Sequence, residues 1–365
     1  MGFSCGIVGL PNVGKSTIFN ALTHAGAAME NYPFCTIDPN VGIVPVPDKR
    51  LSAIAEIFKP QKVTPTTLEV VDIAGLVKGA SQGEGLGNQF LSHIRQVQAI
   101  LHVVRCFEDS NVVHVDGNVN PLRDVEVIHL ELALSDLEAV QKRILRTEKL
   151  LKGGDKKAQE ELQFLQEVKR QLEQGKAARE LTLSSDQQDF LSQELSLLTA
   201  KPVLYVANIS EQDLLKDSPY VSSLRKYAEE RGSQVIQISG KIEAELSVLP
   251  LEEQKAFLKE LGAEEPGLYQ LIQAGYQLLN YITFFTAGEK EVRAWTIQKG
   301  TKAPQAAGVI HSDFERGFIR AETYHYEDLM KYKTEAEVRA KGLFRSEGKE
   351  YSVRDGDILL FRFNV

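Results

Sequence analysis

Short apolar runs that alternate with amphipathic stretches dominate the first 280 residues of the chain. The runs are rich in aliphatic and β-branched residues and lie at 3–9, 67–72, 99–104, 202–207 and 235–238. Helical periodicity marks the stretches between them, as at 15–23, 89–98 and 222–231. Strands that alternate with helices predict a mostly parallel sheet with helices on both faces, which is an α/β fold.

The alternation stops between residues 126 and 197, where two leucine-rich segments follow helical spacing. The apolar positions of the first segment are Leu130, Leu134, Leu137, Ile144 and Leu151. A second segment repeats the pattern at 162–172, and KGGDKK at 152–157 is typical of a turn. We predict an antiparallel helical hairpin with coiled-coil character, inserted into the α/β domain. A plain helical layer packed on the sheet is the alternative.

A different pattern begins near residue 281. Strand-like segments lie at 282–286, 292–297, 317–321 and 358–363, and short helices are expected at 304–310 and 326–332. This order predicts a small α+β domain in which a curled sheet grips a helix. The expected domains are 1–125 plus 198–280 for the α/β domain, 126–197 for the hairpin and 281–365 for the C-terminal domain.

The composition is that of a globular protein and argues against two function classes. The 365 residues are 43% hydrophobic without a run of 18 apolar residues, so we expect no membrane-spanning helix and no membrane partner. Cys5, Cys35 and Cys106 show no CxxC spacing, which favours reduced thiols in a cytoplasmic protein. The formal net charge of −8 argues against a general polyanion-binding protein.

A local basic face is compatible with that average charge. Residues 283–365 contain 14 Lys and Arg against 13 Asp and Glu, a net charge of +1. Basic and aromatic residues of this segment are candidates for an RNA-facing surface. They are Lys299, Lys302, Arg316, Arg320, Phe318 and Tyr324. A solvated surface whose charges pair with one another explains the same composition equally well.

Residues 9–16, GLPNVGKS, match the phosphate-binding pattern G-x-x-x-x-G-K-[ST]. The match lies between a predicted strand and a predicted helix, which is the context that the motif requires. Its backbone N–H groups and the helix N-terminus point at phosphate oxygens. We expect Lys15 to reach the β- and γ-phosphates and the Ser16 hydroxyl to bind Mg²⁺. The nucleotide-binding residues of this loop are then Asn12, Val13, Gly14, Lys15, Ser16 and Thr17.

Two further segments complete the pattern of a nucleotide switch. DIAG, from Asp72 to Gly75, matches D-x-x-G directly after an apolar strand. Asp72 is therefore expected to hold Mg²⁺, and the Gly75 N–H to sense the γ-phosphate. Thr36 stands in F-x-T-x-x-P-x-x-G and is assigned to the Mg²⁺ shell in a loop that closes over the γ-phosphate. A plain turn, indicated by Pro33 and Pro39, is the alternative for that segment.

The expected base-recognition motif is altered. GTPases with a phosphate-binding loop of this kind usually read guanine with the motif N-K-x-D, in which the Asp carboxylate accepts hydrogen bonds from two donors of the base. Here the strand at 202–207 is followed by N-I-S-E, with Asn208, Ile209 and Glu211. The longer Glu211 side chain places its carboxylate elsewhere, so the case for GTP specificity is weakened. After the next strand, Ser239 and Gly240 of I-S-G-K resemble the loop that contacts the base from its other side.

Several strings together carry a family resemblance. GLPNVGKST, YPFCTIDPNVG, DIAGLVKGASQGEGLGNQFL, N-x-S-E and ISGKIEAEL resemble the YchF-type P-loop ATPases of the Obg-related superfamily, essentially end to end. The C-terminal segment resembles a TGS domain, a ubiquitin-like β-grasp module. The resemblance implies the helical hairpin, a link to ribosomes or translation, and a preference for ATP over GTP through Asn208, Ile209 and Glu211.

One position bears on the rate of hydrolysis. Leu76 follows D-x-x-G where many relatives carry a glutamine that orients water, and leucine cannot orient water. We therefore expect slow intrinsic hydrolysis and a site that a loop, an ion or a partner completes. Asn12 is the residue type seen in potassium-stimulated relatives, which makes K⁺ one candidate. His114 is another, and a surface loop histidine is its plainer interpretation.

These features lead to one hypothesis and two alternatives. The leading hypothesis is a cytoplasmic switch in which ATP and Mg²⁺ order Thr36 and the glycine-rich segment 75–87. The hairpin and the C-terminal domain would report that state to a ribosomal subunit or RNA. A GTPase with a divergent base motif is the first alternative. A scaffold that holds nucleotide with negligible turnover is the second, and Leu76 keeps it open.

Overall fold

A computed structural model of the chain describes residues 4–27, 40–73, 86–109, 112, 114, 117–151 and 156–364. Contacts between residues divide the chain into two compact units. The first unit comprises residues 1–44 and 69–275, and the C-terminal unit comprises residues 45–68 and 276–365. Each unit has its own sheet and its own hydrophobic core.

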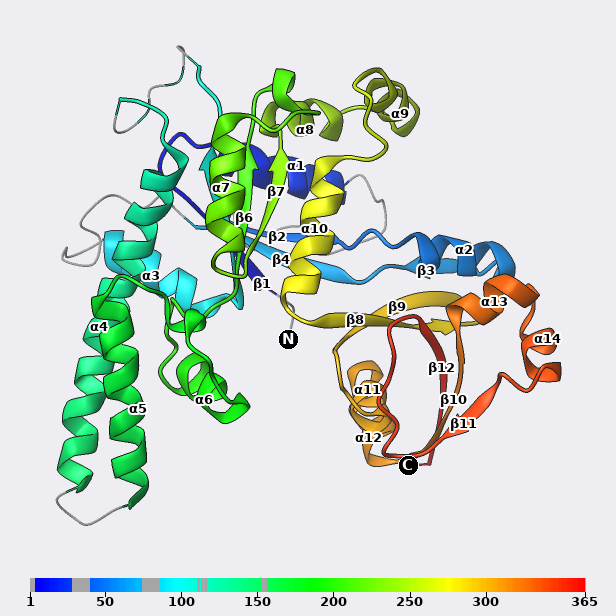
Figure 1. Cartoon of the computed structure of the whole chain (residues 1–365). Helices are drawn as coiled ribbons and strands as arrows, with labels where there is room; N and C mark the ends of the chain where they lie inside the picture. The colour runs from blue at the N-terminus through cyan, green and yellow to red at the C-terminus, as the bar shows by residue number, and fades with distance from the viewer. Residues whose placement is uncertain are drawn as a thin grey trace. The chain divides into compact units, whose positions relative to one another are not determined.

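A six-stranded sheet forms the centre of the first unit, in the order β2-β4-β1-β5-β6-β7 (Figure 1). In that order the strands span Val41–Pro45, Thr67–Asp72, Ser4–Val8, Ala99–Arg105, Val203–Asn208 and Gln234–Ile238. β1 pairs in parallel with β4 and β5, and β6 and β7 continue in the same direction. Every residue of β1, β5 and β6 is buried, as expected of parallel strands covered on both faces. The predicted α/β fold is confirmed.

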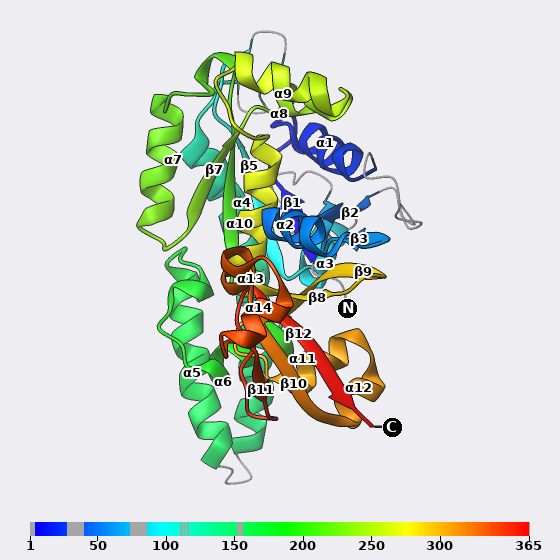
Figure 2. The same cartoon turned by 90° about the vertical axis from the view of Figure 1, so that its right-hand side faces the viewer.

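Helices cover both faces of this sheet (Figure 2). α1 (Lys15–Ala27) packs against α8 (Gly240–Ser247) on one face. α7 (Pro219–Glu229) packs on β6 and β7 from the other face, next to α4 (Pro121–Leu151). The remaining helices of the unit are α3 (Leu86–Gln96), α5 (Lys156–Glu173), α6 (Ser185–Asp189), α9 (Leu251–Glu260) and α10 (Gly267–Leu278).

α4 and α5 form the predicted hairpin, which extends away from the sheet in Figure 1. The two helices enclose a core that includes Val140, Leu165 and Val168. The first turns of α4 pack on β5 instead, with Val125 and Ile128 buried. A single helix therefore supplies both the hairpin and the helical layer that the sequence presents as alternatives.

The buried face of α4 differs from the predicted one. Helical spacing places Leu130 and Leu134 in the core, yet these side chains are 54% and 37% exposed. Leu132 and Ala133 are buried in their place. The prediction is wrong at Leu130 and Leu134, whereas Leu137 and Ile144 pack against the hairpin core as predicted. The difference arises because α4 carries apolar residues on more than one side. The sheet, which lies outside the local pattern, selects the side that is buried.

A buried carboxylate fixes the base of the hairpin. Asp136 of α4 accepts hydrogen bonds from the backbone N–H groups of Leu198 at 2.8 Å and Thr199 at 2.7 Å. The Thr199 hydroxyl donates a third at 2.6 Å. Burial raises the pKa of Asp136, and these three donors oppose that rise. The hairpin is thereby joined to the segment that leads into β6.

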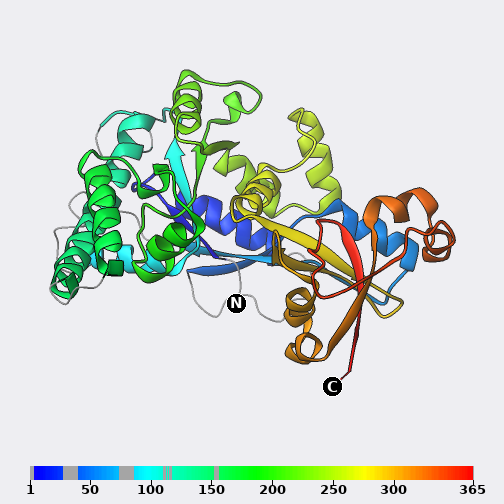
Figure 3. The ribbon, with the colours of Figure 1, turned by 60° about the horizontal axis from the view of Figure 1, so that its bottom comes forward.

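The C-terminal unit contains a mixed sheet in the order β11-β10-β12-β8-β9-β3. In that order the strands span Arg345–Glu347, Phe318–His325, Asp357–Phe363, Tyr281–Ala287, Glu291–Gln298 and Lys62–Thr64. β8 pairs antiparallel with β9 and in parallel with β12. One face of the sheet packs on α11 (Ala303–Ile310) and α12 (Ser312–Arg316); the other packs on α2 (Lys49–Phe58), α13 (Tyr326–Tyr332) and α14 (Glu335–Ala340) (Figure 3). The expected curled sheet packed on a helix is confirmed.

Residues 45–68 belong to this C-terminal unit, although the sequence places them within the α/β domain. Leu51 and Ile54 of α2 are buried in one cluster with Phe285 and Val292 of the sheet. β3 pairs in parallel with β9. The expected boundary at residue 281 therefore misses one segment. Its position in the sequence misled the assignment, because it lies between two strands of the first sheet.

The two aromatic candidates for RNA stacking are core residues. Phe318 is 6% exposed and Tyr324 is 4% exposed, and each belongs to a hydrophobic cluster on one face of the sheet. The expectation that these rings offer a stacking surface is wrong, because helices cover both faces of this sheet. Basic candidates of the same segment form ion pairs, as the alternative expected: Lys302–Glu350, Arg316–Asp313 and Arg320–Glu322.

Two of the three cysteines are described by the structure. Cys5 and Cys106 are buried free thiols, and burial raises the pKa of each to about 12. Both thiols are therefore inert at neutral pH. Cys35 lies outside the described residues. Within the described ranges, no helix combines the length and the apolar character that a bilayer crossing requires.

Two histidines lie where α4 meets the sheet. His102 of β5 is 5% exposed, and burial lowers its pKa to about 3, with smaller effects of His129, Arg179 and Lys15. Burial likewise lowers the pKa of His129 to about 4, helped by Arg179 and opposed by Glu180. His129 Nε2 is buried without a hydrogen-bond partner in the described part of the chain. Both rings are therefore neutral in the folded chain at pH 7.

We expect stability to fall as the pH drops below the ordinary histidine pKa. The unfolded chain binds a proton at position 129 below about pH 6.5, whereas folded His129 does so only near pH 4, so acid favours the unfolded state. Denaturant titrations measure how much unfolding free energy is lost between pH 7 and pH 5. This loss should be smaller in His129→Gln than in the wild type, by roughly 1–2 kcal/mol. Exposed His93 supplies the control His93→Gln, which should behave as the wild type. Equal losses in all three proteins would contradict this account.

Candidate functional site

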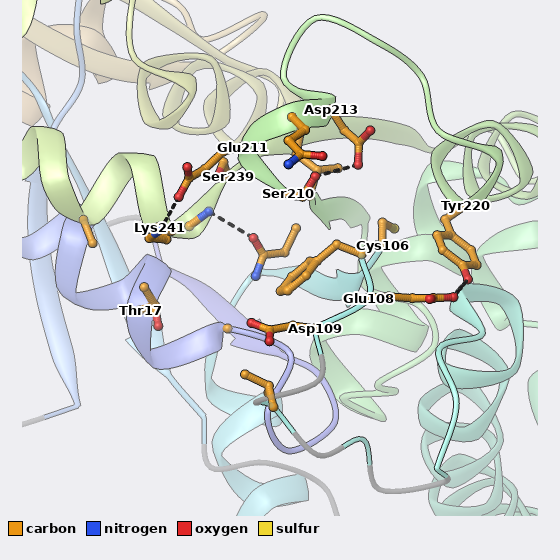
Figure 4. Close-up of a pocket in the computed structure, with 18 of the residues that line it drawn as sticks. Thr17, Cys106, Glu108, Asp109, Ser210, Glu211, Asp213, Tyr220, Ser239 and Lys241 are labelled. Atoms are coloured by element: carbon orange, nitrogen blue, oxygen red, sulfur yellow. Dashed lines mark hydrogen bonds and ion pairs between the residues drawn. The ribbon is translucent and has the colours of Figure 1, made fainter. Parts of the chain in front are cut away.

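The carboxyl ends of five parallel strands meet at one edge of the first sheet. The strands that follow β1 in the chain lie on both sides of it, and sheets of this kind bind ligands at such a switch point. A pocket of about 1180 Å³ opens at this edge (Figure 4). The loops after β1, β5, β6 and β7 line it, so the fold itself brings the predicted motifs together.

Two glycines allow the loop after β1 its close approach to neighbouring strands. Gly14 adopts a left-handed conformation with φ +96°, and a Cβ atom there would lie 2.2 Å from Asn208 Nδ2. A Cβ atom at Gly9 would lie 2.5 Å from the Val103 carbonyl oxygen. Any larger residue would push this loop away from β5 and β6. The two glycines of the motif therefore serve packing as well as phosphate binding.

Lys15 begins α1 and is largely withdrawn from water. The residue is 7% exposed, and its Nζ donates a hydrogen bond to the Leu10 carbonyl at 2.7 Å. Burial lowers the pKa of Lys15 to about 8, while the Asp72 carboxylate opposes that change. A poorly solvated ammonium gains strongly from contact with an anion. This environment suits the predicted contact with the β- and γ-phosphates.

Asp72 ends β4 beside the same loop. Ser16 Oγ donates to Asp72 Oδ2 at 3.3 Å. The other carboxylate oxygen, Oδ1, is buried and has no hydrogen-bond partner among the described residues. Burial raises the pKa of Asp72, whereas Ser16 and Lys15 lower it. An added cation would relieve the cost of this buried oxygen.

The Ser16 hydroxyl and the Asp72 carboxylate fit a magnesium ion. Mg²⁺ prefers oxygen ligands in an octahedral set and usually takes several of them from phosphates and water. In the part of the chain that the structure describes, no group of three or more His, Cys, Asp or Glu residues is arranged to hold a metal. Thr36 and Gly75 lie outside the described residues, so their roles stay predictions.

Asn208 connects two loops of the pocket through its side chain. Its Nδ2 donates to the Val13 carbonyl at 2.8 Å, and its Oδ1 accepts from the Gly240 N–H at 3.0 Å. The residue is 5% exposed. Ile209 is also buried, and its N–H donates to the Ile238 carbonyl at 2.9 Å. Asn208 thus positions the pocket, with both ends of its amide engaged by the protein.

Glu211 forms an ion pair with Lys241 at 2.5 Å. Both side chains are accessible, with 45% of Glu211 and 70% of Lys241 exposed. They come from a short 3₁₀ turn and from the first turn of α8, and Figure 4 shows them facing each other. The carboxylate that replaces the guanine-reading Asp is therefore engaged by a cation. Ser239 and Gly240 also line the pocket, and Ser239 Oγ is buried without a partner among the described residues.

His114 is buried and paired with a carboxylate of α4. Its Nε2 lies 2.8 Å from Asp124 Oδ2, and the two side chains are 4% and 3% exposed. Asp124 belongs to the first turn of α4 and also contacts Arg123 at 3.1 Å. His114 is not among the described residues that line the pocket. The pair joins His114 to the start of α4, so the interpretation as a surface histidine is wrong, and the catalytic role stays a prediction.

Sequence reasoning missed one wall of the pocket. Phe107, Glu108, Asp109 and Val112 follow β5 and line this wall, and the Tyr220 hydroxyl at the start of α7 donates to Glu108 Oε1 at 2.6 Å. The sequence RCFED at 105–109 comes directly after the predicted strand at 99–104, and this position could have identified the wall. Residues at that position border the ligand edge of a parallel sheet.

Two family models match the chain. Residues 4–142 match a family described as "50S ribosome-binding GTPase". Residues 281–364 match the family of YchF GTPase C-terminal domains, which is described as "Protein of unknown function". The two matches cover the P-loop part of the first unit and most of the C-terminal unit.

Curated relatives are similar over the full length. The chain is 56% identical over 365 residues to the "Ribosome-binding ATPase YchF" of Escherichia coli O157:H7, and 57% identical over 367 residues to that of Bacillus subtilis. Both alignments cover 100% of each chain. A solved structure of the Schizosaccharomyces pombe YchF GTPase superimposes with a TM-score of 0.90 at 44% identity, over 99% of this chain and 98% of that chain.

We expect Gly14→Ala to weaken nucleotide binding by tenfold or more. The added methyl group would collide with Asn208 and strain a left-handed backbone, so the loop and its neighbour would separate. Gly175→Ala is a matched control, because Gly175 has φ +70° with nothing within 4 Å of the added atom. Titration of a fluorescent ATP analogue should show normal affinity in the control. Equal affinity of the two variants would contradict the role of this contact.

Proposed function

The chain belongs to the YchF family, and on that basis we propose that it binds ATP with Mg²⁺ and hydrolyses it slowly as a nucleotide-dependent switch. The observation that carries the proposal is the pocket in which Lys15 and Ser16 meet Asp72 while Glu211 is held by Lys241. The reaction is ATP plus water to ADP plus phosphate. We propose that the protein acts in the cytoplasm, where ribosomes are found.

The phosphate end of the pocket is built for a triphosphate. Lys15 would exchange its Leu10 carbonyl for the β- and γ-phosphates, whose charge compensates a buried ammonium better than a carbonyl does. Backbone N–H groups of the loop and the N-terminus of α1 bind the remaining oxygens. Ser16 and Asp72 would hold Mg²⁺, with Thr36 as the proposed third ligand. When bound, the ion neutralises charge shared by the β- and γ-phosphates.

Hydrolysis requires a water molecule in line with the γ-phosphate. Lys15 stabilises the charge that develops on the transferred group, and the Gly75 N–H is proposed to bond a γ-phosphate oxygen. Leu76 offers no group that orients the attacking water, so intrinsic turnover should be slow. A K⁺ ion near Asn12 or a contact from a bound partner would complete the site. His114, which is paired with Asp124, stays a further candidate for this role.

The base end of the pocket favours adenine. Guanine presents an N1–H and a 2-amino group that need an acceptor, and the Glu211 carboxylate is engaged by Lys241. The Asn208 amide is also engaged at both ends. Guanine would have to compete with Lys241 and with the loop contacts of Asn208 for an acceptor, whereas adenine lacks those two donors. Ile209 and Phe107 supply apolar contact that does not distinguish the two bases.

The partner is proposed from the names of the relatives, two of which are called ribosome-binding ATPases. The α4–α5 hairpin and the C-terminal unit are the two parts of the chain that the nucleotide pocket does not use. We propose that they contact a ribosomal subunit or its RNA. The aromatic rings that sequence analysis assigned to RNA are excluded from this contact, because they are buried.

Two other functions fit part of the same geometry. A GTPase with a divergent base motif would explain why the S. pombe relative is named a GTPase. A scaffold that holds nucleotide without turnover would explain the leucine at position 76. Base preference separates the first from our proposal, and turnover separates the second.

We expect the purified chain to bind ATP at least tenfold more tightly than GTP, which is about 1.4 kcal/mol. In Lys241→Met, the released Glu211 carboxylate should accept from guanine, so GTP affinity should rise several-fold while ATP affinity stays within twofold. Lys255→Met is the control, because Lys255 pairs with Glu252 on α9 at 2.9 Å and does not line the pocket. Calorimetric titration with non-hydrolysable analogues measures all six affinities. Tighter binding of GTP to the wild type would establish the GTPase alternative.

We expect slow release of phosphate from ATP that increases when ribosomes or K⁺ are added. Lys15→Ala should abolish this turnover and retain the thermal unfolding temperature of the wild type within a few degrees, because Lys15 acts on phosphate and not on the core. Single-turnover assays with radiolabelled ATP provide the measurement. Turnover that stays at the level of Lys15→Ala under every condition would favour the scaffold.

A further inference from the structure

Arg105 is a buried arginine at the ligand edge of the first sheet. It is the last residue of β5, it is 1% exposed, and it lies opposite Asn208 in the β5–β6 ladder. Burial of a guanidinium is costly unless its donors are satisfied. Here three different N–H groups donate to backbone carbonyls: Nε to Phe107 at 3.1 Å, Nη1 to Val112 at 3.0 Å and Nη2 to Asp109 at 3.2 Å.

The three residues that these carbonyls belong to all line the nucleotide pocket. The guanidinium carbon also lies 4.9 Å from the centre of the Phe107 ring, which is a cation–π distance. Figure 4 shows Glu108 and Asp109 of this loop across the pocket from Ser210 and Asp213. A single planar group therefore holds the described backbone of this wall at three points, the carbonyls of Phe107, Asp109 and Val112.

We propose that Arg105 is a positioning residue for the base end of the nucleotide pocket. It holds Phe107, Asp109 and Val112 in the arrangement that accepts a purine opposite the loops after β6 and β7. The inference rests on the proposed function and deepens it, because it names the residue that shapes the wall for ATP. Arg105 does this through the loop, without a contact to the nucleotide, and its charge is secondary to its shape.

The shape of the guanidinium is the important property. Five N–H groups in one plane reach carbonyls that lie in different directions, whereas a lysine ammonium is a point donor on a shorter stem. A lysine at position 105 retains the positive charge and loses at least one of the three bonds. A wall that is held at fewer points is less pre-organised, so binding a base must first order it. The phosphate loop after β1 has its own ties through Asn208 and Lys15 and does not depend on this wall.

The test compares a ligand that has a base with one that has none. ATP and inorganic tripolyphosphate are titrated, with Mg²⁺, into the wild type, Arg105→Lys and Arg105→Met. We expect ATP affinity to fall about fivefold to tenfold in Arg105→Lys and more in Arg105→Met, while tripolyphosphate affinity stays within twofold in both. Steady-state assays should show a raised KM for ATP with kcat within twofold, because the wall provides uniform binding.

Two further variants keep the test decisive. Arg179→Lys is the matched control. Arg179 donates a hydrogen bond of 3.2 Å to the Thr199 carbonyl and does not line the pocket, so this variant should leave the ratio of the two affinities unchanged. If Arg105→Met does not fold, Tyr220→Phe replaces it. That variant removes only the outer bond to Glu108 and should weaken ATP alone by about twofold to threefold.

Three results would overturn the inference. The first is an equal loss of ATP and tripolyphosphate affinity, which would make Arg105 a source of charge or of general stability. The second is a lowered kcat at constant KM, which indicates a smaller folded fraction. The third is wild-type behaviour of Arg105→Lys. Failure of the wild type to bind ATP at all would instead refute the proposed function, so the two failures are distinguishable.

Discussion

The side-chain amide of Asn208 is the interaction on which the nucleotide pocket depends. It bonds the loop after β1 at Val13 and the loop after β7 at Gly240, while its own backbone ends β6. Three segments that are far apart in the sequence are thereby fixed by one buried group. Gly14 has to be a glycine because this amide occupies the space of its Cβ atom. The loop proposed to bind the phosphates and the loop proposed to contact the base are therefore joined by the same side chain.

This arrangement explains which part of the guanine motif is retained in the chain. The Asn of N-K-x-D ties loops together and is needed whatever the base is, so it is kept as Asn208. The Lys and the Asp of the motif face the base, and here they are replaced by Ile209 and Glu211. A change of base preference can thus proceed without disturbing the frame of the pocket. On the proposed preference for ATP, the frame and the specificity reside in different residues of one short motif.

The sequence predicts well what local physics determines. Continuous apolar runs identify five of the six strands of the first sheet, and period-3.6 patterns identify helices such as α1 and α7. The loop at 9–16 is specific because its chemistry requires a fixed spacing. Long-range packing is less accessible. The face of α4 that is buried, the transfer of residues 45–68 to the other unit, and the burial of Phe318 depend on surfaces that local periodicity does not contain. The burial of His114 is not predicted for the same reason, since its partner Asp124 is identified only by the fold.

α4 is one continuous helix of 31 residues, so it is about 46 Å long. Its first half is fixed to β5, to the buried pair at its start and, through Asp136, to the segment before β6. The part beyond Asp136, residues 137–151, is about 23 Å long and is therefore a lever arm whose pivot is the base of the hairpin. A tilt of about 10° at this pivot would move the end of α4 by about 4 Å, which is large enough to make or break an intermolecular contact. Such a geometry would convert a small rearrangement at the base of the hairpin into a larger displacement at its far end.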